Sequence, residues 1–235
     1  MRIPATRLDN FGTYAFAALD AAKKEAARRM RVIDMGVGDP DFPPPAIISD
    51  ALSRAAYFPE FHRYPDYEGD AFFREAVADF MLDTHKVRLN SENQVALSVG
   101  SKEGIFHFPF AVVNRGEKVA YTSPGYPIYR AGAIFADASP VALPLLEADQ
   151  FVLDLERVPH DIKLLWINYP NNPTSAIVER SFYEQLVQLA LQHEFIVAVD
   201  AAYAQTCFGA EHPSILTVEG AEKCCVEFHS ISKMF

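Results

Sequence analysis

Apolar residues occur along the chain in two alternating patterns. Short runs rich in β-branched and aromatic residues are typical of buried strands, whereas apolar residues repeating every three to four positions indicate amphipathic helices. Helices are predicted over residues 71–85 and 179–193, and an alanine-, lysine- and arginine-rich helix over residues 14–30. Buried strands are predicted over residues 32–37, 94–99, 118–121, 140–145, 163–168, 195–199 and 224–228. Strand and helix therefore alternate along most of the chain.

This alternation predicts an α/β fold of three layers, in which helices cover both faces of a mainly parallel sheet. In such folds, ligands bind at the carboxyl ends of the strands. The helix over residues 14–30 precedes every strand. We therefore expect residues 1–33 to form an N-terminal segment that belongs to a small domain or a subunit contact, and residues 34–235 to form the main domain.

The amino-acid composition limits the kinds of molecule that the protein is expected to bind. Half of the 235 residues are apolar and the net charge is −10, without a basic run of the kind that binds nucleic acid or acidic lipid. No stretch has the length and apolarity of a membrane span, and the start lacks the core of a signal peptide. Cys207, Cys224 and Cys225 are odd in number and lack metal-ligand spacing, so reduced thiols are expected. These features predict a cytoplasmic protein with a small-molecule partner.

The run that ends the chain contains the most informative residue. Lys233 follows a predicted strand and is preceded by Ser230 and Ser232. A lysine at a strand end can form an imine with an aldehyde cofactor, and Ser230 could then hold the phosphate of that cofactor. The same lysine alone is also typical of a solvated charge, so the interpretation depends on partners elsewhere in the sequence.

Other predicted strand ends supply such partners. Residues 100–104, Gly-Ser-Lys-Glu-Gly, precede a helical run whose N-terminus could hold a phosphate. Tyr126 lies in a tight turn that could present its ring to a flat ligand, and Asn172 lies before a proline. Asp200 ends an apolar run, with Tyr203 three residues later, and a buried carboxylate requires a cation or a donor. Each feature alone is also typical of an ordinary turn or of core packing.

Taken together, the chain resembles the fold-type I pyridoxal phosphate-dependent aminotransferases of class I/II, and within them most closely the bacterial LL-diaminopimelate aminotransferases. The resemblance spans nearly all of this chain but only the first part of a family chain, so the chain is expected to be C-terminally truncated. Seven segments match in family order, over residues 36–42, 64–69, 100–104, 124–130, 168–175, 200–203 and 227–233.

The resemblance implies catalytic roles. Lys233 would hold the cofactor and later move a proton at the substrate α-carbon. Asp200 would pair with the protonated pyridine nitrogen. Asn172 and Tyr203 would hydrogen-bond the oxygen on the cofactor ring, and Tyr126 would stack on its face.

The resemblance also implies a phosphate site and a dimer. Backbone N–H groups of Ser101 and Lys102, together with the hydroxyl of Ser230, would bind the phosphate. Tyr64 would reach the phosphate of the neighbouring subunit, which implies a homodimer with shared sites.

Three further residues are implied to contact the substrate. Gly38 would lie beside the substrate carboxylate and Tyr14 would line the substrate pocket. Glu68 of the partner would receive the distal ammonium of a diamino acid, although a solvated turn carboxylate explains it equally well.

Two departures from the family pattern stand out. Ser175 occupies a position where most relatives have glycine, which should leave the turn intact. The arginines that bind phosphate and substrate carboxylate after the family lysine have no counterpart here, and neither has a strand that inserts beside the last strand. The small domain is thus largely missing, and a separate polypeptide is an alternative source for it.

The implied function is amino transfer between an amino acid and 2-oxoglutarate, with LL-diaminopimelate in lysine biosynthesis as the expected substrate. Relatives that act on alanine, aspartate, methionine or aromatic amino acids remain alternatives. A β-lyase of a sulfur amino acid uses the same cofactor and base, and a non-catalytic aminotransferase remnant is a third reading. A nucleotide-binding domain fits least, because the glycine pattern is wrong.

Overall fold

The computed structural model describes residues 3, 5–11, 15–36, 38, 40, 42–209 and 212–234, with the backbone alone at residues 10 and 15–17. The chain forms two compact units, residues 1–43 and residues 44–235. The boundary expected from the sequence, between residues 33 and 34, stays a prediction about domain organisation.

The smaller unit contains helix α1 (Ala15–Ala27), which follows a short 3-10 helix. This helix confirms the central part of the one predicted over residues 14–30. Lys23 forms ion pairs of 2.8 Å with Asp20 of the same helix and with Asp34, and so fastens the segment after α1 to the helix. The strand predicted over residues 32–37 is wrong for its described residues, 32–36. A strand needs a neighbour to satisfy its backbone, and the part of this unit that the structure describes contains none.

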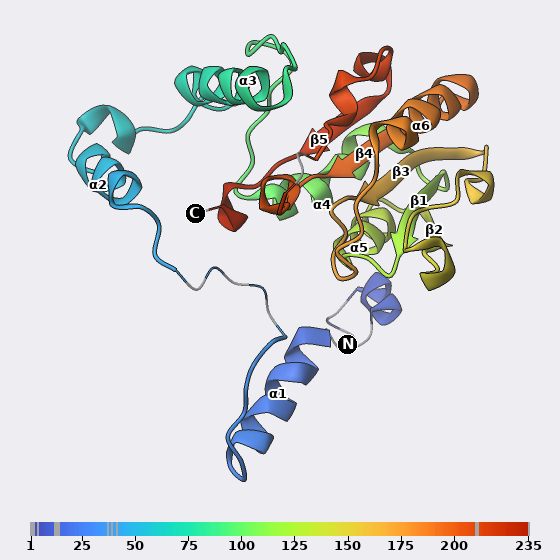
Figure 1. Ribbon diagram of the computed structural model, residues 1–235, viewed down its shortest axis with the longest axis horizontal. Helices are drawn as coiled ribbons and strands as arrows, with labels where there is room; N and C mark the ends of the chain where they lie inside the picture. The colour runs from blue at the N-terminus through green and yellow to red at the C-terminus, as the bar shows by residue number, and fades with distance from the viewer. Residues whose placement is uncertain are drawn as a thin grey trace. The chain divides into compact units, whose positions relative to one another are not determined.

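The larger unit is built on a parallel sheet of five strands in the order β2-β1-β3-β4-β5 (Figure 1). Each strand corresponds to one of the predicted apolar runs. The predicted α/β fold with a mainly parallel sheet is therefore confirmed. The strands are β1 (Lys118–Ser123), β2 (Ser139–Pro144), β3 (Ile162–Asn168), β4 (Ile196–Asp200) and β5 (Cys225–Phe228).

Five helices belong to this unit, among the residues that are described. The bounds of α3 match those predicted from the sequence, and α6 begins one residue later than predicted. No helix in the described ranges is both long and apolar enough to cross a bilayer. The helices are α2 (Ala46–Ala55), α3 (Ala71–His85), α4 (Ser101–Val112), α5 (Ile128–Phe135) and α6 (Arg180–His193).

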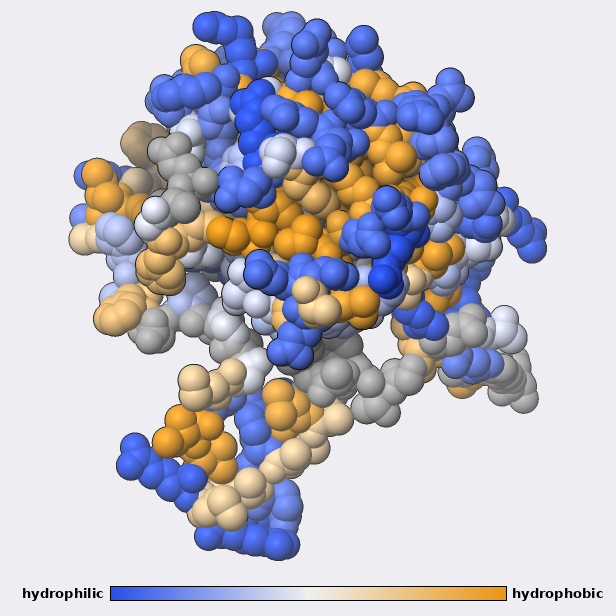
Figure 2. All heavy atoms as spheres, turned by 45° about the vertical axis from the view of Figure 1, so that its right-hand side comes forward, coloured by the Kyte–Doolittle hydropathy of each residue, from blue (hydrophilic) through white to orange (hydrophobic). Residues whose placement is uncertain are grey.

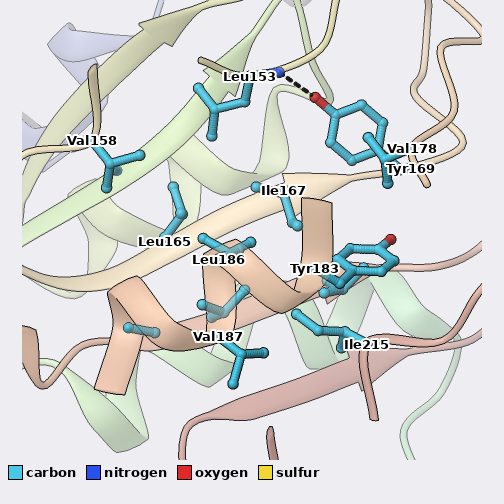
Figure 3. Close-up of a cluster of buried hydrophobic side chains, with 14 of the residues drawn as sticks. Leu153, Val158, Leu165, Ile167, Tyr169, Val178, Tyr183, Leu186, Val187 and Ile215 are labelled. Atoms are coloured by element: carbon cyan, nitrogen blue, oxygen red, sulfur yellow. Dashed lines mark hydrogen bonds between the residues drawn. The ribbon is translucent and has the colours of Figure 1, made fainter. Parts of the chain in front are cut away.

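Side chains of the central strand β3 point alternately to two cores, one on each face of the sheet. Leu165 and Ile167 face the first core, where they pack with Tyr183, Leu186 and Val187 of α6 (Figure 3). At the edge of this core the Tyr169 hydroxyl accepts a hydrogen bond of 2.9 Å from the Leu153 backbone N–H.

The second core lies on the opposite face, under α4 and α5. Leu164 and Trp166 of β3 pack there with Ile105 of α4 and Tyr129 of α5, all fully or almost fully buried. Phe228, the last residue of β5, contacts Trp166 at 5.2 Å between ring centroids. Helices thus cover both faces of the sheet, as predicted.

The strand predicted over residues 94–99 is wrong, because the segment forms no strand. Its burial still alternates: Val95 and Leu97 are half-buried, whereas Ala96 and Ser98 are exposed. The segment therefore has the side-chain pattern of a strand without a hydrogen-bonded neighbour. β5 is an edge strand of this sheet and pairs only with β4. The expectation that a strand of the family sheet inserts beside β5 stays a prediction.

Several large apolar side chains of the larger unit are exposed. Helix α2 buries none of its residues, and Ile47 and Leu52 on it are each 74% exposed. Phe72 at the start of α3 is 73% exposed. Figure 2 shows hydrophobic atoms, in orange, at the surface of this unit over a wide area bordered by hydrophilic side chains. Such surface is typical of contacts with further protein.

Candidate functional site

The carboxyl ends of β3 and β4 bring the first site residues together. Asn168 and Asp200 end these strands and lie opposite each other in the parallel register. The Asn168 amide donates to the Asp200 backbone oxygen at 2.8 Å, and its side-chain oxygen accepts from the Asn172 N–H at 2.7 Å. Asn168 therefore connects the strand end to the loop that carries Asn172.

Asp200 is 5% exposed, and its carboxylate has two hydrogen-bond donors in the described part of the chain. The Tyr129 hydroxyl donates to Oδ2 at 2.7 Å, and the Ala202 N–H donates to Oδ1 at 3.2 Å. Burial raises the pKa of Asp200, although these two hydrogen bonds and the positive charges of His229 and Lys233 act in the opposite direction. A cationic ligand atom beside this carboxylate would offset the cost of its burial.

Tyr129 is a site residue to which sequence reasoning gave no role. Its ring is fully buried and stacked on Trp166, with centroids 5.3 Å apart and planes at 13°. Burial raises the pKa of Tyr129 far above its ordinary value, so the phenol stays protonated and donates to Asp200. The available signal was its position three residues after Tyr126, in the first turn of α5.

The Tyr129→Phe variant is expected to lower the free energy of unfolding by about 1–3 kcal/mol, because the buried Asp200 carboxylate loses a donor while the ring stays in place. The loss should grow as the pH rises and Asp200 ionises, since only the carboxylate needs that donor. Denaturant unfolding over a pH series measures this. Tyr121→Phe, on β1 at the same core, is the control, and equal effects of both variants would contradict the prediction.

Asn172, Tyr203 and Lys233 lie next to this carboxylate. The Asn172 amide nitrogen is 3.5 Å from the Tyr203 hydroxyl, at the outer limit of a hydrogen bond. Lys233 Nζ lies 5.9 Å from the centroid of the Tyr203 ring. Burial and the negative charge of Asp200 raise the pKa of Tyr203. An amide, a phenol and an ammonium thus converge beside a buried carboxylate.

Tyr126 and Lys102 extend the cluster toward α4. The Tyr126 ring packs edge-on against Tyr129, with centroids 6.1 Å apart, and Lys102 Nζ lies 5.9 Å from the centroid of the Tyr126 ring. Gly100, the N-cap of α4, has φ +79°, which favours glycine. The first turn of α4, with Ser101 and Lys102, presents backbone N–H groups that can hold an anion.

Lys233 ends η8 (Ile231–Lys233), a single 3-10 turn after β5. The Ser230 hydroxyl caps this turn by accepting the Ser232 N–H at 3.3 Å. The Ala201 N–H donates to the Phe228 oxygen at 2.9 Å, which ties this segment to the residue after Asp200. Lysine and carboxylate are therefore held by neighbouring strands.

Four further residues were predicted from the sequence to belong to the site. Tyr64 is fully exposed in the single chain. Glu68 forms an ion pair of 3.7 Å with Arg74. Gly38 belongs to the smaller unit, and Tyr14 lies outside the described residues. Their roles stay predictions.

The donor set fits an organic cofactor better than a metal. Among the described residues, no group of three or more His, Cys, Asp or Glu side chains is placed to hold a metal ion. The three cysteines are free and half-buried, and burial raises the pKa of each thiol. The cluster instead combines a carboxylate for a ring cation, an N-terminal helix turn for a phosphate and an amine for an aldehyde.

Comparison with known proteins agrees with this chemistry. Residues 30–235 match the family model of aminotransferase class I and II. The chain is 46% identical to an LL-diaminopimelate aminotransferase of Aquifex aeolicus and 42% identical to one of Maridesulfovibrio salexigens, over 97% and 98% of its length. It covers 61% of each relative. A substrate-bound BacF structure from Bacillus subtilis superposes with a TM-score of 0.94 at 32% identity, over 100% of this chain and 61% of that one.

Proposed function

The chain belongs to the aminotransferase class I and II family, and from this premise we propose that it is the cofactor-binding part of a pyridoxal phosphate-dependent transaminase. The observation that carries the proposal is Asp200, a carboxylate buried at a strand end whose pKa is raised because burial outweighs its partners. A protonated pyridine nitrogen in contact with this carboxylate would offset the cost of its burial.

Pyridoxal phosphate supplies an aldehyde for the substrate amine and a ring that accepts electrons from the α-carbon. The Lys233 amine would hold the cofactor, and the same amine would take and return the proton at the substrate α-carbon. Asp200 keeps the proton on the pyridine nitrogen. Both groups reach one ligand because β4 and β5 are neighbours in the sheet.

The remaining residues hold and orient the ring. Asn172 and Tyr203 donate to the oxygen on the ring, and the 3.5 Å gap between them supports this because neither is committed to a short hydrogen bond with the other. Tyr126 stacks on the ring face, where Tyr129 supports it. These contacts exclude water from one side of the reacting atoms.

The phosphate binds at the N-terminus of α4, through the N–H groups of Ser101 and Lys102, and to the hydroxyl of Ser230. Tyr64 completes this site from a second subunit of a homodimer. The full exposure of the Tyr64 ring and the apolar surface of α2 support an arrangement in which further protein covers this segment.

The substrates we propose are LL-diaminopimelate and 2-oxoglutarate, in lysine biosynthesis. The names of the relatives that are 42–46% identical support the first of these. Gly38 and Tyr14 contact the substrate, and Glu68 of the partner subunit receives its distal ammonium. The 3.7 Å ion pair of the exposed Glu68 side chain with Arg74 shows that this carboxylate can pair with a cation. The cytoplasmic location stays a prediction.

Amino transfer is tested with LL-diaminopimelate whose amino nitrogen is isotopically labelled. The purified chain, supplied with pyridoxal phosphate and 2-oxoglutarate, is expected to place the label in glutamate, which mass spectrometry detects. Alanine and aspartate are the competing donors, and faster transfer from either would overturn the substrate proposal. Release of the label as ammonia would indicate a lyase instead, and absence of cofactor binding would overturn the proposed function as a whole.

A further inference from the structure

Glu227 is a buried carboxylate that the proposed mechanism does not use. It is the third residue of β5, and its side chain is 3% exposed. Its Oε1 accepts hydrogen bonds from the Ser214 hydroxyl at 2.9 Å and from the Ile215 N–H at 2.8 Å. Its Oε2 lies 2.9 Å from His229 Nε2, which must be the donor because an ionised carboxylate can only accept.

Packing alone does not explain why an ionised glutamate occupies this buried position of β5. Burying an ionised carboxylate is costly unless it is fully paired, and an apolar residue would close a strand at lower cost. Burial raises the pKa of Glu227, but the hydrogen bonds from His229, Ser214 and Ile215 outweigh it and leave the pKa below its usual value. The carboxylate is therefore held ionised at neutral pH.

The directions of the Glu227 and His229 side chains follow from the alternation of side chains along β5. Phe228 points to the second core, where it contacts Trp166 and Phe108. Residues on either side of Phe228 point the other way, so Glu227 and His229 share the opposite side. Their hydrogen bond spans the point where β5 ends, immediately before Ser230.

His229 also contacts groups from other elements. Its ring lies 6.0 Å from that of His85 and 6.4 Å from that of Phe80, both on α3. It also lies near enough to Asp200, at the end of β4, and to His212 to influence the pKa of each. The charged and titratable groups around His229 are thus Glu227, His85, His212 and Asp200.

We propose that Glu227 and His229 form a positioning pair for the cofactor site. Glu227 holds the His229 ring, and through it the turn from which Ser230 reaches the phosphate and Lys233 reaches the aldehyde. This inference rests on the proposed function, because it requires pyridoxal phosphate at Lys233.

The test compares Glu227→Gln with Glu222→Gln, which alters an exposed glutamate just before β5. Glutamine keeps the size of the side chain and can still accept from Ser214 or Ile215, but it lacks the charge that holds His229. We expect Glu227→Gln to bind pyridoxal phosphate about tenfold more weakly than wild type, as loss of a charge-assisted hydrogen bond implies. Glu222→Gln should bind as wild type does. Absorbance titration measures the affinity.

Thermal unfolding without cofactor provides a second readout. Because the folded-state pKa of Glu227 is lowered, its contribution to stability is present above the unfolded pKa and is lost as the pH falls through the folded pKa. Glu227→Gln should therefore melt below wild type at neutral pH, and the difference should close in acid. A lower melting temperature together with wild-type affinity would mean a structural role alone and would overturn the inference.

His229→Gln gives an independent variant, because it leaves the buried strand position unchanged. It should weaken cofactor binding to a similar extent, and the double variant should lose less than the two single losses combined, since it leaves no unpaired charge. Wild-type affinity in His229→Gln would overturn the inference even if Glu227→Gln did not fold. Failure of wild type and Glu222→Gln to bind pyridoxal phosphate would overturn the proposed function, and the inference with it.

Discussion

The Lys233→Ala variant is expected to lose all covalent attachment of pyridoxal phosphate. Alanine has no amine to bond to the aldehyde, and the other contacts of the cofactor are non-covalent. Borohydride reduction of the loaded protein, followed by peptide mass spectrometry, should find the cofactor on Lys233 in wild type and on no peptide in the variant. Transamination should fall to background, because the same side chain moves the proton.

Lys102 is the alternative attachment point that the structure offers. Its Nζ lies 5.9 Å from the Tyr126 ring, so it is a second ammonium at the edge of the same cluster. Lys102→Ala should keep the covalent label on Lys233, because the role proposed for Lys102 is its backbone N–H. Label on Lys102 in wild type, or label retained in Lys233→Ala, would contradict the assignment of the nucleophile.

The sequence predicted those helices and strands that are capped, paired or covered by other residues of this chain. Helix α3 has the bounds that its apolar spacing indicates, because its N-cap Asp70 accepts the Phe72 N–H and its C-cap Lys86 adopts a left-handed conformation. Both caps are local signals. The five strands were found because each is paired and covered, which is the condition that gives a strand its apolar run.

Residues 94–99 show where such reasoning fails. Their alternating pattern is a true strand pattern, yet a strand is defined by hydrogen bonds to a neighbour, and that neighbour is not encoded in the segment. The alternating pattern is the one expected of a strand in the family fold. The structure shows instead which contacts these residues make in this chain.

The sequence predicted the site residues that follow the strands, but not the hydrogen bonds that join them to distant residues. Asp200, Asn172 and Lys233 follow buried runs, and the rule that ligands bind at strand ends singled them out. The hydrogen bond from Tyr129 to Asp200 joins residues 71 positions apart, and the pairing of Glu227 with Ser214 depends on how a loop folds over β5. Such hydrogen bonds depend on the tertiary structure, so they cannot be predicted from local residue spacing.

The Asp200→Asn variant is expected to change function and stability in opposite directions. Loss of the charge that keeps the pyridine nitrogen protonated should lower the rate of transamination by about 10²–10³-fold, the effect typical of removing one electrostatic partner of the reacting group. Asparagine has the volume of aspartate and can still accept from Tyr129, so the site should keep its shape. Steady-state kinetics and absorbance titration measure the loss.

The stability change follows from the sign of the pKa shift. The folded-state pKa of Asp200 is raised above its unfolded value, so its favourable contribution is present below the unfolded pKa and is lost as the pH rises through the folded pKa. At neutral pH, which lies above the unfolded pKa, this buried group therefore costs stability in the protein without cofactor. Asp200→Asn should melt above wild type there, and the difference should vanish in acid, opposite to Glu227→Gln.

Asp149→Asn, which alters an exposed aspartate, is the matched control and should change neither affinity nor melting temperature. Adding pyridoxal phosphate should reverse the order of stability, because only wild type gains the ion pair with the ring. A buried group that costs stability until its ligand arrives is best explained by selection for the ligand. If Asp200→Asn melted below wild type at neutral pH and bound pyridoxal phosphate equally well, Asp200 would be a structural residue, and the observation that carries the proposed function would be lost.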